Sequence, residues 1–326
     1  MKLTKILCLC LTLILALSAF ALTSCSDDGK YNVGVVQLVQ HPALDAATEG
    51  FKDALVEAFG ENVKIDVQNA AGSTDTCATI VSTFVTKNVD LIMANATPAL
   101  QAAQNATNII PVLGTSITEY GVALGIENFT GTVGTNISGT SDLAPLNEQA
   151  NMIVDLAPEA KKVAMLYCSA EANSDYQVKE VTRFLTDKGI ECKAFPFSDS
   201  NDVQLIATQA ADWADAMYIP TDNTAASCAE AIWGAIADKK IPVITGEEGI
   251  CGGTGLATLS IDYYDLGYAT GEMAVKILKG EANVSEMPIE YTPEDKIAKK
   301  YNKEICEAIG YDAQALEAKG YVAIEK

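Results

Sequence analysis

A repeated alternation of short apolar runs and amphipathic stretches is the feature that most constrains the fold of this chain. The strands predicted for a first series cover residues 33–39, 63–67, 90–94 and 109–113. Beyond a Gly/Thr/Ser-rich bridge at 131–140 the pattern restarts, with strands expected at 162–167, 191–197, 216–219, 241–245 and 257–262. Strands that alternate with helices favour parallel sheets covered on both faces. We therefore expect an α/β fold with two Rossmann-like lobes and a cleft between them.

The helices expected between these strands follow the 3.6-residue apolar period. They cover residues 43–59, 74–87, 98–106, 143–157, 173–188, 201–211, 224–238 and 264–279. The last stretch, 292–326, is expected to be helical and charged. Two α/β lobes in one chain suggest a protein that closes on a ligand about a hinge.

The N-terminal 30 residues predict where the chain works. Lys2 and Lys5 precede an apolar run at 6–22, which is typical of a secretory signal and short for a membrane span. Small residues before Cys25 resemble a bacterial lipobox. We expect 1–24 to be a lipoprotein signal peptide, Cys25 to be lipidated, and 25–30 to be a tether. The alternative is an ordinary signal peptide cut elsewhere. The expected location is extracytoplasmic, lipid-anchored to a bacterial membrane.

Charge and residue usage exclude several classes of function. The formal net charge is −21, and it becomes −23 once Lys2 and Lys5 are removed, so the surface repels nucleic acid. His41 is the single histidine, which argues against a Ser-His-Asp triad and against a multi-histidine zinc site. Arg183, the single arginine, falls in a predicted helix and is expected to be solvated or salt-bridged. No metal or cofactor is expected, and the chain is not expected to be an enzyme.

Six cysteines remain outside the signal and the lipidation site, at 77, 168, 192, 228, 251 and 306. Their spacing contains no CxxC, so metal binding is not expected. Buried thiols in a large domain are the main expectation. A Cys228–Cys251 disulfide is the alternative, because both residues fall near predicted strand ends.

Ligands of parallel sheets bind beyond the carboxyl ends of the strands, and this rule selects candidate residues from the sequence. In the first lobe they are Gln40, His41, Asn69, Thr97, Thr115 and Ser116. In the second lobe they are Ser169, Glu171, Asn173, Thr221, Asp222, Asn223 and Glu247.

The chemistry of these candidates suits a zwitterion. Thr97 is expected to cap a helix whose N-terminal amides and dipole could bind a carboxylate without arginine. Thr115 and Ser116 could add hydroxyls. Glu171, Asp222 and Glu247 are candidates for an ammonium group, with solvated rim charges as the alternative.

The aromatic candidates have two readings each. His41 either lines the pocket and stacks on a ligand ring or is a surface loop residue before Pro42. Tyr263 and Tyr264 either face the pocket or pack at the hinge.

Several short sequence segments of the chain follow a recognisable order and spacing. They are Gln68-Asn69-Ala70-Ala71-Gly72, Ala96-Thr97-Pro98-Ala99, Gly139-Thr140-Ser141-Asp142, Ser169-Ala170-Glu171-Ala172-Asn173-Ser174, Pro220-Thr221-Asp222-Asn223-Thr224 and Ile261-Asp262-Tyr263-Tyr264. Together they resemble the ABC-transporter substrate-binding lipoproteins linked to uptake of tryptophan or other aromatic amino acids. The third segment adds Ser141 and Asp142 to the candidate ligand-binding residues.

The resemblance implies the type I periplasmic-binding-protein fold, in which the chain crosses three times between lobes. Lobe one would comprise 31–140 plus about 263–282, and lobe two 141–262 plus about 283–326. It also implies that Thr97, Thr115 and Ser116 hold a ligand carboxylate, with Asp222, Asn223 or Glu247 opposite.

The implied function is an extracytoplasmic receptor of an ABC importer, monomeric, that captures an aromatic L-amino acid and docks on a membrane permease. The alternatives are a receptor for a branched-chain amino acid, a sugar or a nucleoside, a partner of a membrane sensor kinase, or an extracellular hydrolase. Trp213 and Trp233 fall in predicted helices, which disfavours a sugar stacked between aromatic rings. The hydrolase would need a nucleophile elbow that the sequence lacks.

Overall fold

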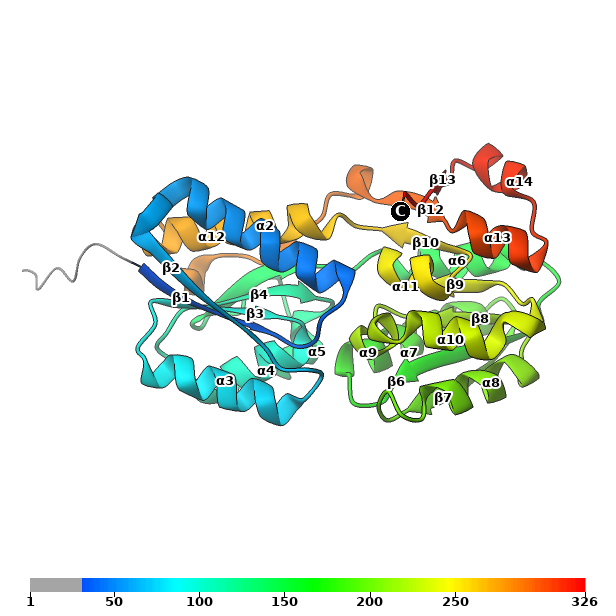
Figure 1. The fold of residues 1–326 in the computed structure, drawn as a ribbon, viewed down its shortest axis with the longest axis horizontal. Coiled ribbons are helices and arrows are strands. Elements are labelled where there is room, and N and C mark those ends of the chain that lie inside the picture. The colour runs from blue at the N-terminus through cyan, green and yellow to red at the C-terminus, as the bar shows by residue number, and fades with distance from the viewer. Residues whose placement is uncertain (1–30, 326) are drawn as a thin grey trace, which may run out of the picture.

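The computed structural model describes residues 31–325, which form two lobes side by side (Figure 1). The signal, Cys25 and the tether lie outside the described residues. The first sheet takes its strands in the order β11 (Glu290–Tyr291), β5 (Ile137–Ser141), β4 (Val112–Ile117), β3 (Leu91–Asn95), β1 (Tyr31–Gln37) and β2 (Val63–Asn69). The second follows the order β13 (Val322–Ala323), β12 (Ala298–Tyr301), β10 (Ala257–Ser260), β9 (Val243–Thr245), β8 (Ala216–Ile219), β6 (Lys162–Cys168) and β7 (Glu191–Phe197).

We call the first sheet and the helices on it lobe one, and the second sheet with its helices lobe two. The helices of lobe one are α2 (Pro42–Phe59), α3 (Thr74–Thr86), α4 (Thr97–Ala106), α5 (Tyr120–Leu124) and α12 (Tyr263–Leu278). Those of lobe two are α6 (Leu146–Leu156), α7 (Ala172–Thr186), α8 (Val203–Trp213), α9 (Asn223–Ser227), α10 (Ala229–Ile236), α11 (Glu248–Thr254), α13 (Lys303–Ile309) and α14 (Ala313–Ala318). Short 3₁₀ turns cover Gly60–Asn62, Ala237–Lys239, Val284–Glu286 and Glu294–Lys296.

Alternating side chains of the buried strands supply a core on each face of the first sheet. Val33 and Val35 of β1 pack with Phe51 of α2 and Met273 of α12 on one face. Val36 of the same strand packs on the other face, with residues of α3 and α4. Figure 1 shows α2 and α12 lying together over the sheet. The continuous apolar runs therefore reflect burial on both faces, as expected for parallel strands.

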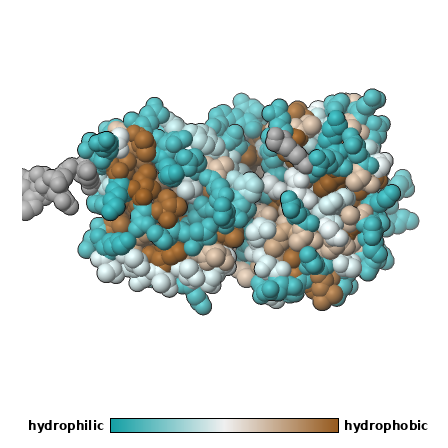
Figure 2. All heavy atoms as spheres, viewed as in Figure 1, coloured by the Kyte–Doolittle hydropathy of each residue, from teal (hydrophilic) through white to brown (hydrophobic). Residues whose placement is uncertain are grey.

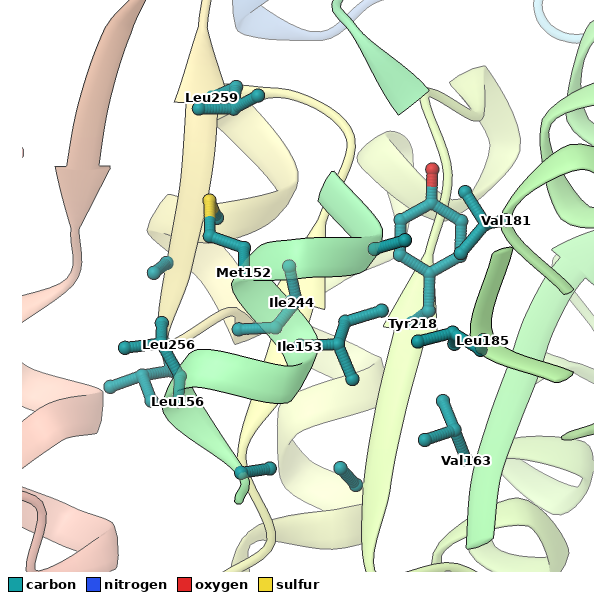
Figure 3. Close-up of a cluster of buried hydrophobic side chains, with 14 of the residues drawn as sticks. Met152, Ile153, Leu156, Val163, Val181, Leu185, Tyr218, Ile244, Leu256 and Leu259 are labelled. Carbon is teal, nitrogen blue, oxygen red and sulfur yellow. The ribbon is translucent and has the colours of Figure 1, made fainter. Parts of the chain in front are cut away.

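Lobe two has the same layered build. Met152, Ile153 and Leu156 of α6 pack over Tyr218 of β8 and Ile244 of β9 (Figure 3). Its strands pair in parallel except β10 and β12, which are antiparallel. The expected α/β fold with two mostly parallel sheets is confirmed.

The chain passes between the two sheets three times, after β5, after β10 and after β11. One expected boundary needs correction. The segment 284–291 was expected in lobe two, yet β11 pairs with β5, and Val284 and Ile289 are buried in the cores of lobe one. The sequence hides this because β11 is two residues long and both residues are exposed.

Three further expectations differ from the structure. The bridge at 131–140 contains most of β5, and the helical tail expected at 292–326 contains β12 and β13. The helix expected at 224–238 is split at Cys228 into α9 and α10. The short helices α5 and α11 were not anticipated, because five and seven residues are too few to show a helical period.

β5 escapes recognition because its centre is a glycine demanded by close packing. A Cβ on Gly139 would lie 2.0 Å from the carbonyl oxygen of Gly114 on β4, and Gly139 has a φ of +143°. Glycine therefore lets β4 and β5 approach, although it weakens the apolar pattern by which strands are recognised.

All six cysteines among the described residues are free thiols, so the alternative of a Cys228–Cys251 disulfide is not supported. No helix within 31–325 has both the length and the apolar character needed to cross a bilayer. Figure 2 shows hydrophilic side chains over much of this face of both lobes, in keeping with the net charge of −21.

Candidate functional site

Neighbouring strand ends of lobe one bring three candidate residues to one edge of its sheet. The order β5, β4, β3 places Asp142 directly after β5, Ser116 near the end of β4, and Thr97 two residues after β3. The backbone here is unusual, because Ala96 has a φ of 92° and Ser116 a φ of 56°. The β4–β5 register also shifts between Gly114 and Ile117. Positive φ at non-glycine residues costs on the order of 1–3 kcal/mol and is typical of functional sites.

The N-terminus of α4 has no side-chain cap. Its N-cap is Ala96, which has no side-chain oxygen to bond the first amides. Pro98 lies in the first turn, and Thr97, expected as the cap, is instead the first helical residue, only 2% exposed. Free amides and the helix dipole at this end favour a carboxylate.

Thr115 and Ser116, which were expected after a strand ending at 113, lie within the last three residues of β4 and have different roles. Thr115 Oγ1 lies 3.3 Å from Thr140 Oγ1, which lies 2.8 Å from Thr270 Oγ1, so this hydroxyl is used in joining β4, β5 and α12. Ser116 Oγ is buried and has no hydrogen-bond partner among the described residues. Of the two, Ser116 can bond a ligand carboxylate.

Asp142 is a buried carboxyl with one oxygen unused. Its Oδ2 accepts a hydrogen bond from Tyr263 Oη at 2.8 Å, whereas Oδ1 has no partner within the described part of the chain. Desolvation raises the pKa of Asp142, opposed by hydrogen bonding from Tyr263, from the Thr118 side chain and from its own backbone amide. A buried carboxyl that lacks a cation is suited to receive an ammonium group. Of the two readings of Tyr263, its bond to Asp142 and its place in the lining of the larger hollow favour the one in which it faces the pocket.

The three acids of lobe two that are candidates for the ammonium group are buried, so they are not solvated rim charges, and each accepts hydrogen bonds from amides at a helix N-terminus. Asp222 accepts from the amides of Cys168 and Ala225 at 2.7 and 2.8 Å. Glu247 accepts from the amides of Gly249, at 2.6 Å, and Ile250. Burial and neighbouring Glu171 raise the pKa of Asp222, and burial raises the pKa of Glu247 to about 7.

Glu171, the third acid, is fully engaged as well. Its two oxygens accept from the backbone amides of Asn223 and Thr224, from Thr224 Oγ1, and from Asn223 Nδ2 at 2.6 Å. Its role is therefore to hold the start of α9. Caps and ligand acids both occur at strand–helix junctions, so the sequence alone does not separate them.

His41 and Asn223 join the two lobes directly. His41 is 6% exposed, and its Nε2 lies 3.2 Å from Asn223 Oδ1. His41 Nδ1 is buried without a partner among the described residues. Desolvation lowers the pKa of His41, opposed by Asn223, Glu171 and Asp45. The surface-loop reading is wrong because the ring is buried, and His41 lines the larger hollow between the lobes, whereas its stacking on a ligand ring stays a prediction.

Asn173 lies beside this pair in lobe two. Its Nδ2 donates to the carbonyl of Thr221 at 3.0 Å, and its Oδ1 is buried without a partner among the described residues. Gln177, one helical turn further on, donates from Nε2 to the same carbonyl, and its Oε1 accepts a hydrogen bond from the Thr221 amide. Gln177 was not anticipated, although its i, i+4 spacing from Asn173 puts both on one face of α7.

The remaining candidates serve local structure. Asn69 is exposed, and its Oδ1 caps a turn through the amide of Ala71. Ser169, also exposed, donates to the Phe197 carbonyl, and Thr221 Oγ1 donates to the Gly246 carbonyl. Ser141 donates to the Thr118 carbonyl. Gln40 is exposed at a groove between the lobes.

Two hollows lie where the lobes meet. The larger, a groove of about 1380 Å³, is lined by His41 and Tyr263 of lobe one and by Glu247 of lobe two. A smaller one of about 250 Å³ is lined by Pro98 of lobe one and Glu171 of lobe two. Of the groups described above, His41 and Tyr263, which donates to Asp142, line the larger hollow, and Pro98 at the start of α4 lines the smaller one, whereas Ser116 and Asp142 line neither. The arrangement holds acceptors, hydroxyls and amides for binding, and within 31–325 no His/Cys/Asp/Glu group is suited to hold a metal ion.

Comparison with known proteins identifies the family of this chain. A family model described as "ABC transporter substrate binding protein" matches residues 32–308. The chain belongs to this family. The "Tyrosine-binding protein" of Clostridioides difficile is 35% identical to it over 335 residues, covering 97% of this chain and 95% of that protein. The expected family is therefore confirmed, and with it the type I periplasmic-binding-protein fold.

Two solved relatives indicate how the lobes of this substrate-binding protein are set. An ABC domain from Streptococcus pneumonia in complex with L-Trp is 31% identical, covers 90% of this chain and 100% of that chain, and superposes with a TM-score of 0.84. A ligand-free, open substrate-binding protein from Clostridium difficile is 38% identical with coverage of 90% and 100%, yet its TM-score is 0.66. The lobes here are thus arranged more as in the L-Trp complex than as in the open protein.

Family membership settles the broad role of the chain. It is a substrate-binding protein of an ABC transporter, a class that works outside the cytoplasm. Solute capture between lobes accounts for the site chemistry without a reacting nucleophile.

Proposed function

We propose that this chain captures an aromatic L-amino acid for an ABC importer, bound between its two lobes. The observation that carries the proposal is the set of unpaired polar groups near the junction between the lobes. It offers open helix amides and Ser116 for a carboxylate, and the unused Asp142 oxygen for an ammonium group. Relatives named for tyrosine and solved with L-Trp support an aromatic side chain on the ligand.

The binding mode follows from the positions of these groups. The ligand carboxylate meets the amides at the start of α4 and Ser116 Oγ, and its ammonium group meets Asp142. Residues of lobe two, with Asn173 and Asn223 foremost, close over it. Closure occurs because the closed state makes contacts with the ligand that the open state lacks.

A thermal-shift and calorimetric screen of the purified protein against the twenty amino acids tests the ligand class. Tyrosine, tryptophan or phenylalanine should raise the melting temperature and bind with the largest affinity. A rise with non-aromatic amino acids alone would refute the aromatic assignment, and no rise with any of them would refute the amino acid class.

We propose further that the protein is a monomer tethered through a lipid on Cys25 and delivers its ligand to a membrane permease. Replacing Cys25 by Ala should move the protein from the membrane fraction to the soluble fraction of expressing cells and abolish labelling by a radioactive fatty acid. Unchanged fractionation and labelling would contradict the lipid anchor. Light scattering of the purified protein measures its oligomeric state.

A further inference from the structure

The hydrogen bonds around His41 determine which of its ring nitrogens carries the proton. Glu171 accepts from two backbone amides, so it acts as a carboxylate acceptor. The side-chain group of Asn223 that lies 2.6 Å from it must therefore be the NH₂ donor. This orientation turns Asn223 Oδ1 toward His41, so His41 Nε2 carries the proton and donates it.

The other ring nitrogen of His41 is then a bare acceptor. The lowered pKa of His41 indicates a neutral ring, in which one nitrogen donates and the other accepts. Nδ1 is buried and has no partner among the described residues. A buried acceptor left unpaired is costly, so the site favours a ligand that supplies a donor there.

Strand order separates this acceptor from the ammonium site. Asp142 follows β5 and His41 follows β1, with β4 and β3 between them in the sheet. Neighbouring strands lie about 4.8 Å apart, so the ends of β5 and β1 are about 14 Å apart. A ligand whose backbone groups occupy Asp142, Ser116 and the start of α4 extends its side chain toward β1 and His41.

We propose that His41 Nδ1 accepts a hydrogen bond from a donor on the ligand's aromatic ring, so that the site selects tyrosine or tryptophan over phenylalanine. Tyrosine offers a phenol O–H and tryptophan an indole N–H, whereas phenylalanine has no ring donor. The inference rests on the proposed function, and it adds a specificity residue together with the tautomer it needs. Asn223 and Glu171 act as positioning residues, because they fix the His41 proton on Nε2.

Matched ligand pairs test this by calorimetry. L-Tyrosine is compared with L-phenylalanine, and L-tryptophan with 1-methyl-L-tryptophan, which lacks the indole N–H. In whichever of the two pairs binds to the protein, the ligand with the ring donor should bind roughly 10- to 100-fold more tightly than the ligand without it. In His41→Phe this ratio should fall toward one, and in Thr83→Ala, an exposed position of α3 that lines neither hollow, it should stay as in the parent protein.

Spectroscopy reads the proton directly, because His41 is the single histidine of the chain. In protein labelled with ¹⁵N-histidine, Nε2 should resonate as a protonated nitrogen and Nδ1 as a bare one, and ligand should shift Nδ1 upfield. A protonated Nδ1, or equal affinities within both pairs, would overturn the role of His41 while leaving aromatic amino acid binding intact. Failure of every aromatic amino acid to bind would instead refute the proposed function.

Discussion

Tyr263 Oη donates to Asp142 Oδ2 at 2.8 Å, although the two residues are 121 positions apart in the chain. Asp142 begins the first passage between the sheets, after β5, and Tyr263 ends the second, after β10. The proposed ammonium partner is thus held by a residue at another crossing. Opening and closing about the crossings is expected to change the position of this carboxyl.

Asp142→Asn should lower the affinity for the amino acid ligand by about 10- to 100-fold. The reason is loss of a charge-assisted hydrogen bond, typically about 1.5–3 kcal/mol. Tyr263→Phe leaves the carboxylate in place and should cost less, about 3- to 10-fold. Calorimetric titration measures both. Undiminished affinity of the Asp142 variant would exclude it as the ammonium partner.

Ligand affinity should fall as pH drops from 7.5 to 5.5. Burial lowers the pKa of His41 below its ordinary value of 6.5, and we expect opening of the lobes or unfolding to expose the ring and return it toward that value. The open form therefore takes up the proton below about pH 6.5, and burial of His41 is disfavoured there. The limit is about tenfold in affinity per pH unit for one proton. Protonation of Asp142, whose pKa is raised, weakens ammonium binding in the same direction.

The variant His41→Gln separates these two groups in the pH titration. It should remove the part of the pH dependence that lies near 6.5 and keep any part due to Asp142. Titrations of ligand at five pH values in both proteins provide the comparison. A profile identical to that of the parent protein would show that His41 does not titrate in this range.

Glu247→Ala should lower the free energy of unfolding by about 1 kcal/mol, as expected for the loss of an N-cap. Its carboxylate holds the amides of Gly249 and Ile250 at the start of α11. Urea unfolding measures the change. An unaltered unfolding free energy together with a tenfold weaker ligand would return Glu247 to the ammonium role expected from its position after a strand.

Gly139→Ala should destabilise the protein by about 3 kcal/mol, because it combines overpacking with a strained φ. Its Cβ would lie 2.0 Å from the Gly114 carbonyl oxygen, in the strand pair that leads to Ser116 and Asp142. Gly234→Ala is the matched control. A Cβ there meets nothing within 4 Å inside α10, so stability should rise by about 0.5–1 kcal/mol. Equal urea midpoints for the two variants would contradict the close approach.

Most of the layered architecture could be predicted from the sequence. The strands β1, β3, β6 and β8 appear there as continuous apolar runs, because they are buried on both faces. β5 could not, because Gly139 is selected by contact with Gly114 rather than by strand propensity. β11 and β13 could not either, because two residues carry no period.

The strand-end rule selected the candidate residues, but it did not distinguish their hydrogen-bonding roles. Glu171 and Asp142 both follow strands, and their sequence surroundings do not reveal that one has all its oxygens occupied and the other has one unused. That distinction depends on which amides the folded chain brings within reach. The tautomer of His41 likewise depends on Asn223, 182 residues away.

The three passages between the sheets have a consequence for how the protein matures. During synthesis the first strand of lobe one emerges first, but α12, which covers its sheet, and β11, at its edge, emerge after most of lobe two. Contacts across so long a stretch of chain form slowly. Lobe one therefore cannot complete its fold until most of lobe two has been synthesised, and a truncated product ending before residue 263 would expose the apolar face of α2 to chaperones and proteases.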